Sequence, residues 1–182
     1  MILKLSNIHF TSNLHFRNKQ VALSRGFSDV ETMENSIIEQ WNQQVKPDDT
    51  IYILGEFCSI VKGALQSYMN LVYELNGKKH FILSSNDYIE TFNTMMEDPN
   101  LGILSVSQYK EVMFMTQRVV MMHYPMLEWA GMGGIRGSVH LHGGKVASDL
   151  DIRRINISFD QESIIYTGED IFKQLTKANK KD

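Results

Sequence analysis

The chain of 182 residues lacks the features that define several protein classes. It contains one cysteine, Cys58, which excludes an intramolecular disulfide and a zinc site built from several cysteines. No apolar run approaches the roughly 20 residues of a membrane span, and the first residues form no apolar run of signal-peptide length. Phosphate and dinucleotide loops of the GxxxxGK and GxGxxG types are also missing. We therefore expect a cytoplasmic protein with no membrane partner and no nucleotide site of these kinds.

The chain also has no excess of charge of one sign. Its net charge is −3 at pH 7, so no general attraction to nucleic acid or an anionic membrane is expected. Apolar residues make up 43% and charged residues 21%, as in ordinary globular proteins, and the length suits one domain covering residues 1–182. Nucleic-acid binding is left as an alternative that depends on one local basic patch. The patch would consist of Arg17, Lys19, Arg25, Arg136 and Lys145.

The first half of the sequence alternates helical and strand patterns. Ser28 and Glu31 form a capping-box signal, and apolar residues at near-helical spacing then run to Val45. The polar segment up to Arg25 and Gly26 is predicted to be irregular. Buried strands are predicted at residues 8–12, 50–54 and 80–83, and two more helices at 65–75 and 88–96. Repetition of helix and strand favours a layered α/β fold.

The second half of the sequence is rich in strand patterns. Strands are predicted at residues 105–114, 119–122, 138–142 and 155–159, and a short helix at residues 172–175 is expected to follow them. Together with the first half, this pattern favours an α/β layered fold whose second half is rich in strands.

Several predicted strands end in polar or glycine-bearing loops that carry residues suited to chemistry. In open α/β sheets such loops meet at one edge, so distant residues come to one site. Four of the six histidines lie in or beside these loops, and imidazole with carboxylate is a donor set for manganese, iron or zinc. For any single histidine, a structural or hydrogen-bonding role is the alternative. The loops contain Asn13 and His15; Glu56; Ser84, Ser85, Asn86 and Asp87; His123; and His140 and His142.

The order of these motifs resembles a known enzyme family. The chain reads FTSNLHF, a helix ending in WNQQVKPDDT, IYILGEF, SSNDY, HYPM and GSVHLHG. The corresponding stretches of the small bacterial and phage calcineurin-like metallophosphoesterases look like TSDLHF, WN..V.PDDTVY, LGDF, GNHDY, HYPM and GS.HLHGHSH. The resemblance covers nearly the whole chain. It implies a four-layer αββα sandwich with two mixed central sheets.

The resemblance implies a family machinery of two metal ions bridged by an aspartate, with a histidine beside the scissile phosphate. Two ligand histidines are kept, as His15 and His123, and Glu56 replaces the bridging aspartate. The remaining positions differ from the family pattern. The first aspartate is Asn13, the metal-binding asparagine is Ser85, the catalytic histidine is Asn86, and the last two histidines fall on Gly144 and Val146.

These differences predict a site without a stable metal centre. Neutral amide and hydroxyl oxygens compensate a cation's desolvation far less than carboxylates do, and two close cations repel each other. Asn86 cannot act as an acid or base near neutral pH, so no catalytic residue is expected. The alternative is one weakly bound divalent ion, Mn, Fe or Zn, held by His15, Glu56 and His123.

An anion-binding role for the same pocket is a further expectation. Its candidate residues are Arg136, His140, His142 and Lys145. The alternative for Lys145 is an ordinary solvent-facing lysine.

The combined pattern predicts a metallophosphoesterase homologue that works by binding rather than catalysis. A protein partner is expected first and a phosphate-bearing ligand second. The distribution of the family suggests a phage protein that acts on a host factor. A metal-dependent phosphodiesterase or phosphatase with a remodelled site is the competing hypothesis, and a nucleic-acid binder is the third.

Overall fold

A computed structural model describes residues 4–59, 64–114, 116–134, 137–145, 153–160 and 164–178. Its first sheet has five strands in the order β4-β3-β2-β1-β9. Strands β1 to β4 pair in parallel and β9 pairs antiparallel to β1, so this sheet is mixed. The bounds are β1 Ile8–Thr11, β2 Thr50–Leu54, β3 Lys78–Ile82, β4 Ile103–Ser107 and β9 Tyr166–Thr167.

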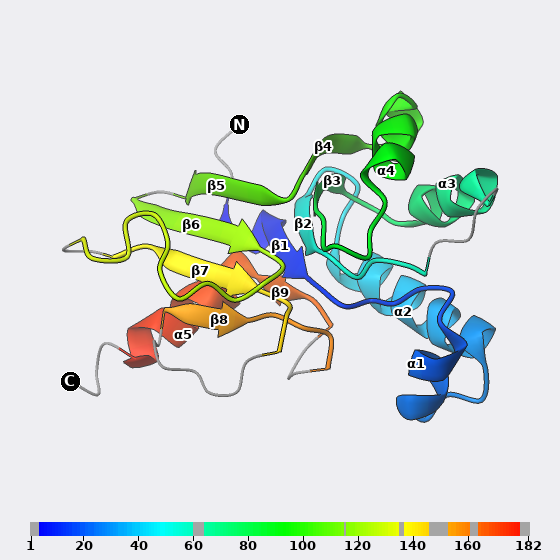
Figure 1. Cartoon of the computed structure of the whole chain (residues 1–182), viewed down its shortest axis with the longest axis horizontal. Coiled ribbons are helices and arrows are strands. Elements are labelled where there is room, and N and C mark those ends of the chain that lie inside the picture. Colours follow the sequence, from blue (N-terminus) through cyan, green and yellow to red (C-terminus); the bar gives the residue numbers. More distant parts are fainter. Residues whose placement is uncertain are drawn as a thin grey trace.

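The second sheet has four strands in the order β5-β6-β7-β8. Strands β5 and β6 form an antiparallel pair, whereas β6, β7 and β8 run parallel, so this sheet is mixed as well. Their bounds are β5 Tyr109–Phe114, β6 Gln117–Met122, β7 Val139–His142 and β8 Arg154–Asn156. Figure 1 shows the two sheets side by side, with β4 continuing into β5.

Helices flank the sheets, and most of them gather at the first one (Figure 1). The bounds are α1 Lys19–Ser24, α2 Val30–Gln44, α3 Leu65–Glu74, α4 Ile89–Met96 and α5 Gly168–Ala178, with short 3-10 turns η1 Leu5–Asn7 and η2 Pro99–Leu101. Helix α5 contacts η1, β9 and β1. The structure is therefore an α/β fold with two mixed sheets flanked by helices. Among the described residues, no helix combines the length and apolarity needed to cross a membrane.

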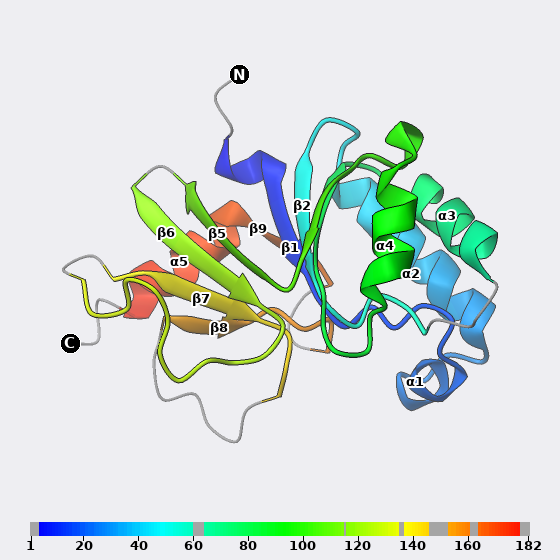
Figure 2. The same ribbon diagram turned by 45° about the horizontal axis from the view of Figure 1, so that its top comes forward.

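Two hydrophobic cores lie on opposite faces of the first sheet. Strand β2 contributes Ile51 and Ile53 to the core beneath α2, α3 and α4, and Tyr52 and Leu54 to the core shared with the second sheet. Figure 2 shows β1 and β2 between these helices on one side and the second sheet on the other. Successive strand residues point to opposite faces, so a run of buried residues is expected of a strand covered on both faces. All five residues of β2 are buried.

Several predicted element boundaries are corrected by the structure. The segment before Gly26, predicted as irregular, contains α1, whose first turn is capped by the Asn18 side chain. Helix α2 is capped by Asp29, which accepts from the Thr32 amide, and not by Ser28. The predicted strand at 105–114 is two strands, β4 and β5, in different sheets. The two-residue strand β9 was not predicted, and α5 is longer than the predicted helix at 172–175.

Candidate functional site

The loops that follow β1 and β2 run side by side at the carboxyl edge of the first sheet. The Asn13 amide donates to the Gly55 carbonyl (3.1 Å), and the His15 amide donates to the Glu56 carbonyl (2.9 Å). Asn13, His15 and Glu56 all have a positive φ, of 60°, 54° and 54°. Left-handed backbone is unfavourable for residues with a side chain, so its concentration here marks a specialised site.

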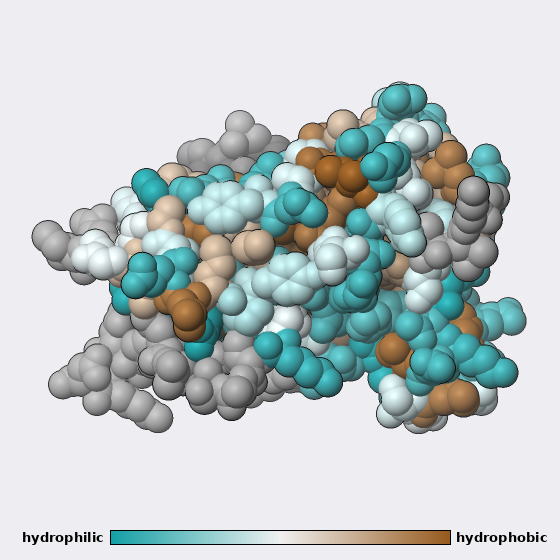
Figure 3. Space-filling model, viewed as in Figure 1, coloured by the Kyte–Doolittle hydropathy of each residue, from teal (hydrophilic) through white to brown (hydrophobic). Residues whose placement is uncertain are grey.

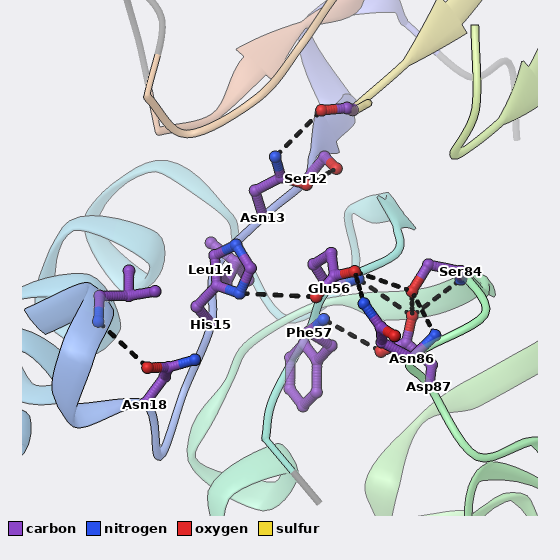
Figure 4. A network of polar contacts seen from close by, with 12 residues as sticks. Ser12, Asn13, Leu14, His15, Asn18, Glu56, Phe57, Ser84, Asn86 and Asp87 are labelled. Carbon is purple, nitrogen blue, oxygen red and sulfur yellow. Dashed lines mark hydrogen bonds and ion pairs between the residues drawn. The ribbon is translucent and has the colours of Figure 1, made fainter. Parts of the chain in front are cut away.

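Glu56 lies at the centre of a hydrogen-bonded network (Figure 4). The Asn86 side-chain amide donates to Glu56 Oε1 (2.5 Å), and His15 Nδ1 lies 3.6 Å from Glu56 Oε2. Burial lowers the pKa of His15, although the Glu56 carboxylate acts in the opposite direction, and Arg25 lowers it further. His15 is therefore neutral at pH 7. The structure thus brings together three of the predicted site positions.

Asp87 joins the loop after β2 to the loop after β3, a role that our sequence reasoning missed. Its carboxylate accepts from the backbone amides of Glu56 (3.0 Å), Phe57 (3.1 Å) and Ser84 (2.8 Å), and from the Ser84 hydroxyl (2.7 Å). The side chain is buried, so these bonds replace the water it has lost. Its position three residues after Ser84, in a short polar loop, was the available signal.

The Asn13 side chain joins the loops of the two sheets. Its amide group donates to the Gly143 carbonyl and to the Ser158 hydroxyl, each at 3.0 Å, and its oxygen accepts from the Ser12 hydroxyl (2.9 Å). A carboxylate at this position could not make the two donations. Asn13 therefore acts as a structural cross-link between the segments after β1, β7 and β8.

His123 follows β6 and reaches across to the first sheet. Its Nδ1 lies 2.8 Å from the Leu54 carbonyl, which can only accept, so Nδ1 carries the proton and Nε2 keeps its lone pair. Gly55 makes this approach possible, because a Cβ at that position would lie 2.6 Å from His123 Nδ1. Its φ of 72° also favours glycine.

Tyr124 connects the loop after β6 with the loop after β3. Its hydroxyl donates to Ser85 Oγ (2.6 Å) and accepts from the Ser85 amide (2.9 Å). Ser85, the position of a metal-binding asparagine in the resembled family, is therefore engaged with a tyrosine. The sequence reasoning did not predict this pair.

His140 and His142 lie inside β7 and are fully buried. His140 Nε2 accepts from the Met126 amide (3.1 Å), which leaves Nδ1 to donate to the Val120 carbonyl (3.2 Å). Burial lowers the pKa of His140 and keeps it neutral. His142 Nδ1 donates to the Gly144 carbonyl (3.0 Å). Both rings lie in the core and have backbone partners. This is the structural, hydrogen-bonding role that stood as the alternative to a ligand role in the sequence analysis.

The described residues of the predicted basic patch do not form one exposed surface. Arg25 donates to the carbonyls of Asn13 (2.6 Å) and Leu14 (3.0 Å) and pairs with Asp160 (2.9 Å). Arg17 Nη1 lies 3.2 Å from Glu34. Lys19 and Lys145 are exposed. Arg136, and also Val146 of the predicted metal positions, lie outside the described residues.

The described side chains do not fit the dinuclear metal centre implied by the resemblance. In the part of the chain that the structure describes, no group of three or more histidine, cysteine, aspartate or glutamate side chains is arranged to hold a metal ion. The Glu56 carboxylate is bonded to Asn86, and Asn13 and Ser85 have protein partners. The carboxyl edge therefore holds an internal polar network.

No protein-family model matches this chain. It is 33% identical over 85 residues to the Gene 66 protein of Mycobacterium phage L5, covering 46% of this chain and 41% of that protein. An uncharacterized protein (MJ1445) of Methanocaldococcus jannaschii is 30% identical over 87 residues, covering 47% of this chain and 49% of that protein. The matches thus span less than half the length of these curated relatives.

One solved structure shares the fold. A protein of unknown function, AQ665 from Aquifex aeolicus, superimposes with a TM-score of 0.67 at 18% identity, covering 91% of this chain and 97% of that chain. This likeness establishes the same fold in a second protein and carries no function. A novel archaeal phosphodiesterase matches with a TM-score of 0.43 at 14% identity, a level too low to support an argument.

Proposed function

We propose that this chain is a metallophosphoesterase homologue that binds a protein partner and does not hydrolyse phosphate esters. The observation that carries this proposal is the network around Glu56. The carboxylate that would bridge two metal ions accepts from the Asn86 amide at 2.5 Å, and Asn86 stands at the position of the resembled family's catalytic histidine. An amide supplies no acid or base near neutral pH.

Exposed apolar side chains on the loops next to this network support a protein partner. Tyr88, Tyr124 and Leu127 are 59%, 41% and 80% exposed. Figure 3 shows an apolar area over the loop between β6 and β7, to which Leu127 belongs. Aromatic and large aliphatic side chains of this kind supply much of the binding energy at protein interfaces. We propose this surface, defined by Tyr88, Tyr124 and Leu127, as the docking face.

The catalytic half of the proposal is tested by metal analysis and an activity assay. Protein purified without chelators should contain far less than one Mn, Fe or Zn per chain. It should not hydrolyse bis(p-nitrophenyl) phosphate above the buffer rate when Mn²⁺ is added. About two metals per chain, with turnover that falls sharply in Glu56→Ala and His123→Ala, would show that the proposal is wrong.

The binding half is tested by affinity purification from the native cells with matched variants. The double variant Tyr88→Ala, Leu127→Ala should lose the proteins that the wild-type chain retains. Tyr73→Ala is the control, because Tyr73 is 69% exposed but lies on α3, away from these loops. Equal recovery with both variants would exclude the docking face.

A second candidate is a metal-dependent phosphodiesterase or phosphatase with a remodelled, mononuclear site. The geometry of His123 favours it, because a histidine that donates Nδ1–H to a backbone carbonyl presents Nε2 as a ligand. The metal analysis distinguishes the two candidates. About one metal per chain, lost in His123→Ala, would support the second.

A further inference from the structure

A second polar cluster lies in the interior-facing row of the first sheet, away from the loops described above. The pairing register places Phe10, Tyr52, His80 and Ser105 opposite one another across β1, β2, β3 and β4. The ring of Phe10 stacks on Tyr52 (centroids 5.5 Å apart), and Tyr52 stacks on His80 (4.7 Å, 13°). The row therefore changes from apolar to polar toward the edge strand β4.

Lys110 of β5 completes this cluster from the second sheet. Its Nζ lies 2.9 Å from Ser105 Oγ, and Ser105 Oγ lies 2.7 Å from His80 Nδ1. Figure 1 shows how this contact arises, because β4 leads directly into β5. His80, Ser105 and Lys110 are all half-buried, so each keeps part of its surface in contact with solvent.

The hydrogen bonds in the cluster have one consistent direction. An ammonium group only donates, so Ser105 Oγ accepts from Lys110. Burial, together with the charge of Lys110, lowers the pKa of His80 to about 4, so the ring is neutral at pH 7. The Ser105 hydroxyl then donates to the His80 Nδ1 lone pair, which is the arrangement in which each group has a partner.

We propose that Ser105 is an activated nucleophile that accepts an acyl group from small activated esters. A nucleophile within hydrogen-bond distance of a base, with the base held by a third group, is the geometry of covalent catalysis. Here His80 is the base and the Tyr52 ring holds it in place. The Lys110 ammonium stabilises negative charge on Ser105 Oγ and on the ester oxygen as it forms.

The reaction can be written with every proton assigned. Ser105 Oγ attacks the ester carbonyl carbon, and its proton passes to His80 Nδ1. The tetrahedral adduct breaks the bond to the leaving alcohol, which takes the proton from His80. The products are O-acyl-Ser105 and a free alcohol, and no oxidant or metal is required.

The test uses the full chain and p-nitrophenyl acetate, followed by release of p-nitrophenolate and peptide mass spectrometry. The wild-type chain should gain one acetyl group on Ser105. Ser105→Ala should lose this label, and His80→Phe, which preserves an aromatic ring against Tyr52, should slow it by roughly 100-fold or more. Lys110→Met should also slow it.

Two controls make the outcome decisive. Ser24→Ala should label like the wild type, because the exposed Ser24 hydroxyl bonds only to the Val21 carbonyl among its described contacts. Alkaline hydroxylamine should remove the label from the isolated peptide, since it cleaves oxygen esters but not the amides formed on lysine. Unchanged labelling in a folded Ser105→Ala chain, a hydroxylamine-resistant label, or no labelling of the wild type would each overturn the proposal.

Discussion

At the scale of single residues, Asn13 shows how one amide determines what the carboxyl edge can hold. Both hydrogens of its amide group are donated to oxygens of the second sheet's loops, at Gly143 and Ser158. The Asn13 side chain therefore stabilises the arrangement of these loops. It does not present a charge to the pocket.

Asn13→Asp should destabilise the protein by about 1–3 kcal/mol, because a carboxylate oxygen would face the Gly143 carbonyl. Urea unfolding at pH 7 measures the change. Asn18→Asp is the control and should be nearly neutral, since Asn18 Oδ1 accepts from the Val21 amide and a carboxylate keeps that bond. If Asn13→Asp were as stable as the wild type, the two hydrogen bonds from the Asn13 amide to Gly143 and Ser158 would not contribute to stability.

His80 makes the stability depend on pH on the acid side. Its pKa lies at about 4 in the folded chain, below the unfolded value of about 6.5, so the folded state binds fewer protons between these values. The contribution of the neutral His80 ring to the free energy of unfolding is fully present above pH 6.5 and is lost as the pH falls toward 4. Lys110 is the charged group that faces the His80 ring, and the ring of Tyr52 stacks on the ring of His80.

We expect a loss of roughly 1–2 kcal/mol from His80 between pH 6.5 and pH 4, after allowing for solvent screening at a half-buried site. Urea midpoints measured across this range in wild type and His80→Phe would show it. The difference between the two chains should change with pH in that window and stay constant above it. A difference in urea midpoint between the two chains that stays constant from pH 4 upward would exclude a lowered pKa of His80 in the folded chain.

At the scale of elements, the side chain of Asp87 links the backbones of the loops that follow β2 and β3. Asp87 accepts from three backbone amides that lie past the ends of these strands. This carboxylate therefore holds the backbones of the two loops together.

Asp87→Ala should cost roughly 3 kcal/mol, because it leaves the amides of Phe57 and Ser84, both buried, without their acceptor. Asp48→Ala is the matched control, as its carboxylate is 89% exposed and its pair with Lys78 should contribute little. Thermal unfolding compares both with the wild type. Equal midpoints for the two variants would show that the Asp87 bonds add nothing.

Predicted elements agree with the structure where the hydrophobic pattern is regular, as in α2, β2 and α3. The pattern fails at 105–114 because an unbroken run of strand-forming residues does not reveal the change of sheet at Gln108, which separates β4 from β5. It also fails at Lys79, which lies outside the predicted strand at 80–83 but is buried in β3, where Nζ donates to the Gly77 and Leu101 carbonyls. Tertiary partners of this kind leave no local signal.

At the scale of the whole molecule, shared strands connect the two cores. Strands β2 and β3 place alternate residues in each core, so neither core can lose its packing without affecting the other. The single domain expected from the chain length stays a prediction, and it is open to a direct test.

The two tryptophans provide that test, because Trp41 lies in the helix-covered core and Trp129 packs against His140 of the second sheet. In Trp41→Phe and in Trp129→Phe, fluorescence of the remaining indole and circular dichroism should give the same urea midpoint. Separate midpoints within either variant would indicate two units that unfold independently.

The convergence of the loops could be predicted from the sequence, whereas their internal bonding could not. Polar residues at strand ends located the edge where His15, Glu56 and Asn86 meet. The partners of Asn13, Ser85 and Arg25 depend on side-chain directions across distant segments, which no spacing rule encodes. Likewise, the buried state of His140 and His142 depends on the loop that covers β7.

Strand β9 has a consequence for how the protein is made. One edge of β1 pairs with Tyr166 and Thr167, which are synthesised more than 150 residues after it. Contacts between such distant segments form late and slowly. During synthesis, β1 therefore exposes unpaired backbone groups until its last neighbour arrives, and the nascent chain is most prone to association in that interval.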